Sequence, residues 1–225
     1  MTRGSFIVLE GLDRSGKSTQ LDLLLTCLQE THVSTESLHF PDRTTSTGVL
    51  IDKYLKRELS LDDWEIHDLY AENRVEKMSH MINLLESGVN IICSRYAFSG
   101  IAYSASKNLN FDKCVAADAG ILAPDLVLFL AADPDILAER AGYGDERYET
   151  RCFQHAVYQN FLKVSELVKS EGIEWKNVDA TRPVDEVSQE ICLSTISLIK
   201  LIEQTNPPLK TMFSAYESLK NKKKL

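Results

Sequence analysis

The stretch that decides the fold is Phe6-Ile7-Val8-Leu9-Glu10-Gly11-Leu12-Asp13-Arg14-Ser15-Gly16-Lys17-Ser18, close to the N-terminus. Its apolar start is rich in β-branched residues, which predicts a short strand buried on both faces. After the glycine-rich part, leucines recur at helical spacing on one face, at Leu21, Leu24, Leu25 and Leu28. A strand, a glycine-rich turn and a helix in this order are typical of the opening of an α/β domain.

Residues 11–18 match the P-loop pattern GxxxxGK[ST] at every fixed position. The glycines of such a loop let backbone N–H groups turn toward phosphate oxygens, and the helix start adds partial positive charge. Lys17 would supply a charge to the β- and γ-phosphates, and the Ser18 hydroxyl would bind Mg²⁺. The motif predicts a nucleoside triphosphate site. It leaves the acceptor open, because GTPases, ATPases and many kinases share it.

The rest of the chain alternates between predicted strands and predicted helices. We expect strands at 37–40, 90–93, 126–130 and 173–178, and helices at 61–86, 134–140, 149–170 and 183–203. Such alternation predicts parallel βαβ units. The expected fold class is α/β, a P-loop NTPase-type three-layer fold with a central parallel sheet of about five strands and helices on both faces.

Length and composition suit one intracellular domain. We expect the domain to cover 1–210 of the 225 residues and a polar, lysine-rich, solvated tail to cover 211–225. The net charge of -8 argues against nonspecific nucleic-acid binding as the main activity. No apolar run approaches the ~20 residues that span a bilayer, and the start Met-Thr-Arg-Gly-Ser has no signal-peptide core.

The five cysteines are widely spaced and form no CxxC pair. This pattern predicts reduced structural thiols in the cytosol, not a metal or redox site. The histidines form no HxxxH pair, so we expect them at surface or satisfied polar positions.

Several short segments, taken in order, resemble the thymidylate kinase family. The opening from Val8 to Thr19 closely resembles that family, and within it the subgroup with an arginine in the P-loop, here Arg14. The further matching segments are Phe40-Pro41-Asp42-Arg43, Glu72-Asn73-Arg74, Arg95-Tyr96-Ala97-Phe98-Ser99-Gly100, Pro124-Asp125-Leu126-Val127 and Glu146-Arg147-Tyr148-Glu149. The resemblance covers residues 4–208. It implies a cytoplasmic homodimer that transfers the γ-phosphate of ATP to dTMP, giving dTDP and ADP, with Mg²⁺ as cofactor.

The resemblance also implies an acceptor site. Arg43 and Arg95 would grip the monophosphate, since a guanidinium fork binds two phosphate oxygens at once. Tyr70 would stack on thymine, and Arg74 would reach a base carbonyl from the same helix face. Asp13 would bind the 3′-hydroxyl, while two tyrosines would pack against the sugar. The full set implied for dTMP is Asp13, Phe40, Arg43, Tyr70, Arg74, Arg95, Ser99, Gly100, Tyr103 and Tyr148.

On the donor side the resemblance implies a lid at 140–149 that closes over ATP and excludes water. Arg14, Lys17 and Arg95 would neutralise charge on the transferring phosphoryl group. Mg²⁺ would be held by Ser18 and, through water, by Glu10. The full set implied for ATP is Gly11, Leu12, Asp13, Arg14, Ser15, Gly16, Lys17, Ser18, Thr19, Arg140, Ala180 and Arg182.

One position departs from the family pattern. After the third strand the family normally carries Asp-Arg-Tyr, whereas this chain reads Ser94-Arg95-Tyr96, so a carboxylate near Mg²⁺ is missing. The acceptor phosphate needs no general base, because its second pKa is about 6. Loss of one electrostatic contributor typically costs ~10²–10³ in rate. We therefore expect a slowed enzyme that still binds both nucleotides.

Two other functions stay open. Ser94 is the one feature that favours a catalytically weak nucleotide-binding homologue with a regulatory role. A deoxynucleoside kinase would phosphorylate a neutral 5′-hydroxyl and would want a carboxylate base. Arg43, Arg74 and Arg95 argue against it, because that chemistry has no use for a monophosphate clamp. The lysine-rich tail is weak support for a nuclear location instead of a cytoplasmic one.

Overall fold

The structure is a computed structural model that describes residues 2–140, 143 and 148–221. Most of the expected lid, at 141–142 and 144–147, lies outside these residues. The elements in chain order are β1 (Phe6–Gly11), α1 (Lys17–Glu30), β2 (Thr35–His39), α2 (Ser46–Leu55), α3 (Asp63–Glu86), β3 (Asn90–Ser94), α4 (Ala97–Ala105), α5 (Phe111–Ala117), β4 (Leu126–Ala131), α6 (Pro134–Ala138), α7 (Arg151–Ser170), β5 (Glu174–Asp179), α8 (Val184–Thr205), the 3₁₀ helix η1 (Ser214–Tyr216) and α9 (Glu217–Asn221).

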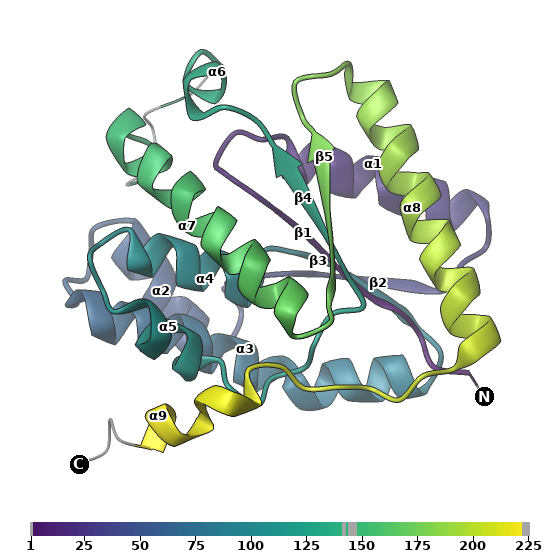
Figure 1. Cartoon of the computed structure of the whole chain (residues 1–225), viewed down its shortest axis with the longest axis horizontal. Coiled ribbons are helices and arrows are strands. Elements are labelled where there is room, and N and C mark those ends of the chain that lie inside the picture. The colour runs from purple at the N-terminus through teal and green to yellow at the C-terminus, as the bar shows by residue number, and fades with distance from the viewer. Residues whose placement is uncertain (1, 141–142, 144–147, 222–225) are drawn as a thin grey trace.

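The described strands form one parallel sheet in the order β2-β3-β1-β4-β5 (Figure 1). Strand β1 is central, and all its residues are buried, which explains its continuous apolar run. Because β3 and β4 flank β1, the carboxyl ends of both strands lie beside the P-loop that follows β1. The predicted α/β fold with a five-stranded parallel sheet is confirmed.

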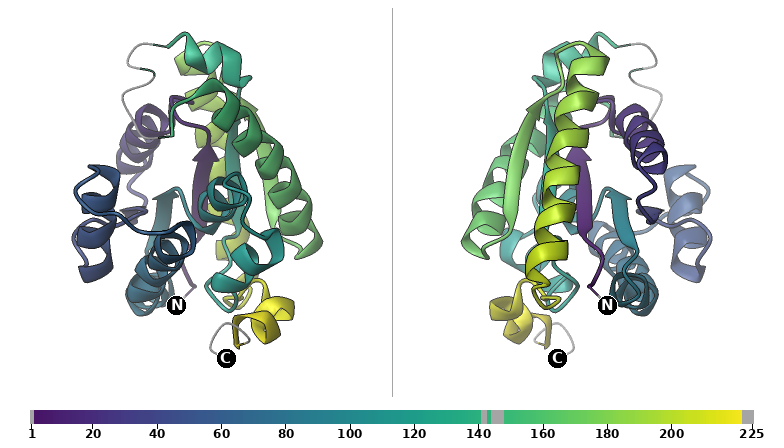
Figure 2. Two further views of the ribbon diagram at one scale, coloured as in Figure 1. Left: turned by 90° about the vertical axis from the view of Figure 1, so that its left-hand side faces the viewer. Right: turned by 90° about the vertical axis from the view of Figure 1, so that its right-hand side faces the viewer.

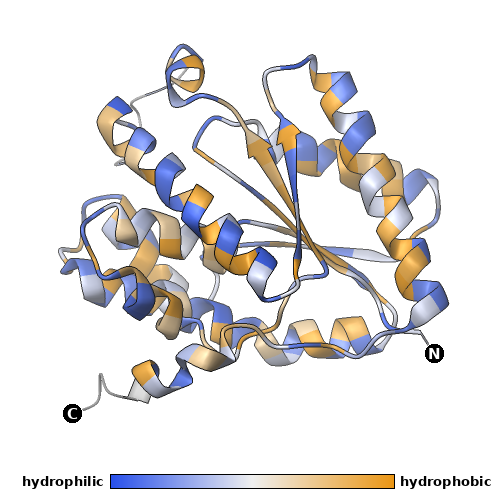
Figure 3. Ribbon diagram, in the orientation of Figure 1, coloured by the Kyte–Doolittle hydropathy of each residue, from blue (hydrophilic) through white to orange (hydrophobic). Residues whose placement is uncertain are grey.

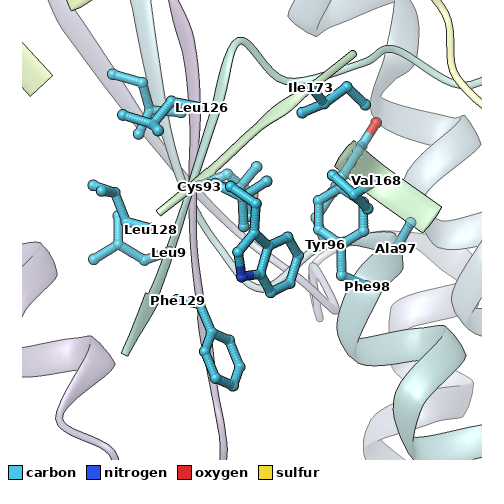
Figure 4. Close-up of a cluster of buried hydrophobic side chains, with 14 of the residues drawn as sticks. Leu9, Cys93, Tyr96, Ala97, Phe98, Leu126, Leu128, Phe129, Val168 and Ile173 are labelled. Atoms are coloured by element: carbon cyan, nitrogen blue, oxygen red, sulfur yellow. The ribbon is translucent and has the colours of Figure 1, made fainter. Parts of the chain in front are cut away.

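Helices cover both faces of the sheet (Figure 2). Helices α1 and α8 pack together over one face, while α4 and α7 pack together over the other, with α3 beside α4. The central strands β1, β3 and β4 are largely apolar, whereas the edge strands β2 and β5 and the outer helix faces carry polar residues (Figure 3). Leu9, Cys93, Leu128 and Phe129 lie in the core between the layers (Figure 4). None of the described helices is long and apolar enough to cross a membrane.

Local signals start two helices where the sequence predicts. Asp133 accepts a hydrogen bond from the Asp135 amide, and Pro134 occupies the first turn of α6. Helix α3 begins with a capping box in which Asp62 and Glu65 satisfy each other's backbone N–H groups. Among the described helices, α2, α4, α5 and the C-terminal α9 were not predicted. Most of α4 is buried, so its sequence lacks the one-sided periodicity of a surface helix.

The prediction that the cysteines are reduced thiols is wrong for one pair. Cys27 of α1 and Cys192 of α8 form a disulfide, although 165 positions separate them in the sequence. The packing of α1 against α8 brings their Cα atoms to 6.9 Å. The other three cysteines stay outside the disulfide, with Cys93 and Cys114 buried and Cys152 exposed.

The folded part continues beyond the boundary predicted at residue 210. Thr211 pairs with Leu122 in an isolated antiparallel bridge, and Met212 and Phe213 are 1% and 0% exposed. Lys220 Nζ donates a hydrogen bond to the Ala119 carbonyl. A solvated tail beginning at 211 is therefore incorrect for Met212 and Phe213, because their apolar side chains join the core.

Candidate functional site

A cavity of about 610 Å³ opens at the carboxyl ends of β1, β2 and β3. In open α/β sheets, ligands bind at this edge. The cavity brings together residues that the sequence places far apart. The expected site residues that line it are Asp13, Arg14, Gly16, Lys17, Ser18, Thr19, Phe40, Arg43, Tyr70, Arg74, Arg95, Ser99, Gly100, Tyr103, Arg140 and Tyr148.

Six expected residues are absent from the lining. Gly11, Leu12 and Ser15 belong to the inner side of the P-loop, where Leu12 is 1% exposed. Ala180 and Arg182 follow β5, and the Arg182 guanidinium pairs with Glu190. The sixth is Glu10, described below.

The P-loop forms the donor side of the cavity. Gly16 has a φ of 93°, a left-handed conformation that favours glycine, and α1 begins at the next residue. The Lys17 ammonium lies on the loop's own carbonyls, 3.0 Å from Gly11 O and 2.6 Å from Leu12 O. Ser18 lines the cavity at the first turn of α1. The start of the helix and the lysine therefore face the same space, as the motif predicts.

Arginines tie the P-loop to later segments. Arg14 Nε donates to Glu149 Oε1 at 2.8 Å. Arg140 donates to the Arg14 carbonyl and to the Ala180 carbonyl, both at 2.7 Å. Arg140 therefore connects the P-loop with the segment after β5, to which Ala180 belongs.

Arg95 and Asp13 form an ion pair in the lining of the cavity. Arg95 follows β3 with a φ of 63°, and its Nη2 pairs with Asp13 Oδ1. The other Asp13 oxygen accepts from Tyr103 Oη at 2.9 Å and from Gln154 Nε2 at 3.0 Å. Burial raises the pKa of Asp13, but Arg95, Lys17 and these hydrogen bonds outweigh it and hold the pKa below its usual value. Asp13 is therefore an ionised carboxylate with both oxygens engaged.

Glu10 does not play the metal role that was expected. Its side chain is 0% exposed and accepts from the backbone amides of Tyr96 and Ser99 at 2.9 and 3.0 Å. It also accepts from the Ser99 hydroxyl. Burial raises the pKa of Glu10 despite these hydrogen bonds and Arg95. The prediction that Glu10 holds Mg²⁺ through water is wrong, because its oxygens instead hold the start of α4, which follows Arg95.

At the far end of the cavity, Tyr70 and Arg74 lie on one face of α3 and both line it. Arg74 is 2% exposed and makes two hydrogen bonds to Asp118, at 2.7 and 2.8 Å. A Cβ atom on Gly100 would stand 3.0 Å from Arg74 Nη2. Glycine at this position therefore allows the guanidinium to lie against the α4 backbone.

Arg43 and Ser94 also line the cavity. Arg43 keeps 54% of its side chain exposed and pairs with Asp52 at 3.0 Å. Ser94 ends β3, next to Leu9 of β1 and His39 of β2. It is 2% exposed and lines the cavity. The position at which the family pattern has a carboxylate is thus inside the site.

The chain is similar to many proteins that are named thymidylate kinases. The family model for thymidylate kinase matches residues 9–191. Thymidylate kinases from Danio rerio and Schizosaccharomyces pombe are 42% and 46% identical, over 90% and 84% of this chain and 94% and 90% of theirs. The structure of thymidylate kinase from Candida albicans superposes with a TM-score of 0.80 at 34% identity, over 95% of this chain and 100% of that one.

The chain belongs to the thymidylate kinase family. The family-level resemblance seen in the sequence is confirmed.

Several residues that line the cavity of this thymidylate kinase family member were missed by sequence reasoning. They are His39, Pro41, Leu55, Tyr96, Ser104, Lys107 and Glu149. Lys107 Nζ lies 5.0 Å from the centre of the Tyr148 ring and 5.8 Å from that of Tyr54. Asp118 and Gln154 were also missed, although they hold Arg74 and Asp13. Pro41, Tyr96 and Glu149 stand inside segments that resemble the family, whereas no motif marks the other positions.

The residues present fit a magnesium ion of the kind a phosphate-transfer site uses. Mg²⁺ keeps several waters and takes one or two protein oxygens together with substrate phosphates. The Ser18 hydroxyl lies in the cavity beside Lys17 and suits such a role. Among the described residues, the one grouping of carboxylates and histidine close enough to share an ion is Asp133, Asp135 and His155, which are exposed and do not line the cavity.

Proposed function

We propose that this chain transfers the γ-phosphate of ATP to the 5′-phosphate of dTMP, giving ADP and dTDP. The observation that carries the proposal is a single cavity lined by the P-loop and by Arg43 and Arg95. Two guanidinium groups beside a triphosphate loop suit an acceptor that already carries a phosphate. Membership of the thymidylate kinase family supports the same reaction.

ATP occupies the donor side in this proposal. The triphosphate lies over the start of α1, where backbone N–H groups and Lys17 neutralise its charge. Lys17 Nζ then exchanges the loop carbonyls for phosphate oxygens. Arg140 lines the same side and is fixed by the Arg14 and Ala180 carbonyls, which supports its place beside the adenine.

The acceptor dTMP occupies the other side. Arg43 and Arg95 bind its phosphate, and Arg43 is the more exposed of the two, with 54% against 20% of the side chain open. Tyr70 stacks on the thymine, Arg74 reaches a base carbonyl, and Tyr103 packs against the sugar. Phe40, Ser99, Gly100 and Tyr148 complete the acceptor set, and Asp13 holds Arg95 in place.

Catalysis is positioning together with neutralisation of charge. The dianionic acceptor phosphate needs no base at neutral pH. Arg14, Lys17 and Arg95 stabilise the charge on the transferring phosphoryl group, and Mg²⁺, held by Ser18 and the phosphates, adds to this when bound. Ser94 in place of a carboxylate slows the reaction without removing nucleotide binding.

Finer properties follow from the family. We infer the subgroup with an arginine in the P-loop from Arg14, a homodimer built from packed helices, and a cytoplasmic location. Light scattering on the purified chain tests the dimer, since a mass of twice 25.4 kDa is expected.

A coupled assay of ADP release tests the reaction, with dTMP, dUMP, dCMP and thymidine as acceptors. We expect turnover with dTMP and none with thymidine. Turnover with thymidine but not with dTMP would support a deoxynucleoside kinase. Tight dTMP binding without dTDP formation would support a regulatory nucleotide-binding homologue, the role that Ser94 favours.

A further inference from the structure

Two polar side chains at the carboxyl edge of the sheet have no hydrogen-bond partner among the described residues. His39 ends β2 and Ser94 ends β3, and the two residues are paired in the parallel ladder. Both line the cavity. Within the described part of the chain, neither the imidazole nor the hydroxyl makes a hydrogen bond or an ion pair. The site therefore holds two adjacent groups that can bind a ligand.

The charges around His39 are mostly positive. Arg95 acts from the turn after β3, Arg43 from the segment after β2, and Lys17 from the P-loop, while Asp42 is the opposing carboxylate. His39 is exposed at the mouth of the cavity, and partial loss of water around the ring, followed by these three cations, lowers the pKa of His39 from its ordinary 6.5. The imidazole is therefore neutral at pH 7 as long as the cations have no anion between them.

We propose that His39 is a further contact for the acceptor's phosphate, binding it as an imidazolium while the neighbouring Ser94 hydroxyl donates a second hydrogen bond. The inference rests on the proposed function and extends it. A phosphate dianion held by Arg43 and Arg95 offsets the two cations and adds negative charge beside the ring. The imidazole then takes one proton from solvent, and its N–H donates to a phosphate oxygen.

Binding of dTMP is expected to depend on pH in one direction. A dianion beside the ring raises the pKa of His39 in the complex above its value in the free protein. Affinity for dTMP is then highest below the free pKa and falls as pH rises through the window between the free and bound values. A rise of one pKa unit corresponds to about tenfold weaker binding across that window. The phosphate of dTMP itself titrates near pH 6. This titration affects every variant equally, so it cancels when the variants are compared with the unaltered chain.

The direct test is proton NMR of the histidine rings in the full chain, titrated without ligand, with dTMP and with thymidine. The His39 signal is identified as the one that disappears in His39→Gln. We expect dTMP to raise the pKa of His39 by one unit or more and thymidine, which lacks the phosphate, to leave it in place. An unchanged His39 pKa with saturating dTMP overturns the proposal.

Kinetics provide the second test. As pH rises from below the free pKa of His39 to above its dTMP-bound pKa, both taken from the NMR titration, the KM for dTMP should rise about tenfold more in the unaltered chain than in His39→Gln, whereas the KM for ATP should not differ. His39→Arg, with a permanent charge, should keep a low KM without this pH dependence. The exposed His80 on α3 provides the control His80→Gln, which should match the unaltered chain. If the ratio of the KM values of His39→Gln and the unaltered chain is the same at every pH, the proposed role of His39 is refuted. The proposed function is not affected by that result. Failure of the unaltered chain to bind or phosphorylate dTMP refutes the proposed function, and the inference with it.

Discussion

The buried ion pair between Arg74 and Asp118 offers the sharpest test of how the acceptor side is built. Its side chains are 2% and 0% exposed, and two hydrogen bonds of 2.7 and 2.8 Å join them. Asp118→Asn keeps the size of the side chain but removes the charge and one acceptor. The guanidinium would then be buried against Gly100 without a counter-charge.

The size of the effect follows from this burial. Removing one partner of a buried pair costs about 3–5 kcal/mol, because it leaves an uncompensated charge. Asparagine still offers one acceptor oxygen, so we expect the free energy of unfolding to fall by about 3 kcal/mol. For a chain of this length, each kcal/mol lowers Tm by about 2–4 °C, so the expected drop is about 6–12 °C.

Urea unfolding and calorimetry measure the stability, and steady-state kinetics measure the site. With Arg74 misplaced, the KM for dTMP should rise while that for ATP stays constant. The matched control is Asp112→Asn, an exposed acid in the first turn of α5, the helix that ends directly before Asp118. A loss below about 1 kcal/mol, the level of an exposed pair, would show that Arg74 does not depend on Asp118. An equal loss in both variants would show that the effect is not specific to the pair.

Three further predictions concern the centre of the site. Ser94→Asp should raise kcat by about 10²-fold, measured by ADP release, and an unchanged kcat would mean that a carboxylate has no role there. Asp13 has a pKa below its ordinary value when folded, so its stabilising contribution is full above the unfolded pKa of about 3.9 and is lost as pH falls through the folded pKa. Urea unfolding should therefore show that the stability difference between the unaltered chain and Asp13→Asn shrinks below about pH 4, and a constant difference would contradict this. Chelation of Mg²⁺ should abolish turnover, and added Mg²⁺ should restore it. Full activity in chelator would rule out the metal.

Sequence alone predicted the parallel α/β fold and the P-loop, because both depend on local patterns. The apolar run 6–9 and the spacing from Gly11 to Ser18 can be recognised without knowing any tertiary contact. The capped starts of α3 and α6 are equally local. The family resemblance then indicated which distant arginines would meet, and Arg43, Arg74 and Arg95 do line one cavity.

What the sequence could not predict depends on partners that only folding brings together. Glu10 looks like a metal ligand beside the P-loop, yet the fold places its carboxylate at the start of α4. The Cys27–Cys192 bond exists because α1 packs on α8. His39 carries no motif, and its chemistry comes from cations contributed by three separate segments.

The difference between features that the sequence predicts and features that only the fold shows has a physical reason. Backbone conformation and the start of a helix are set by residues within one turn of each other, so they can be read along the chain. The charge state of a side chain and the group that it can bind are set by burial and Coulomb interactions across space. For this protein the sequence by itself determined the sheet, the phosphate loop and the set of arginines. The tertiary structure alone decided which carboxylates hold those arginines and which imidazole lines the same cavity.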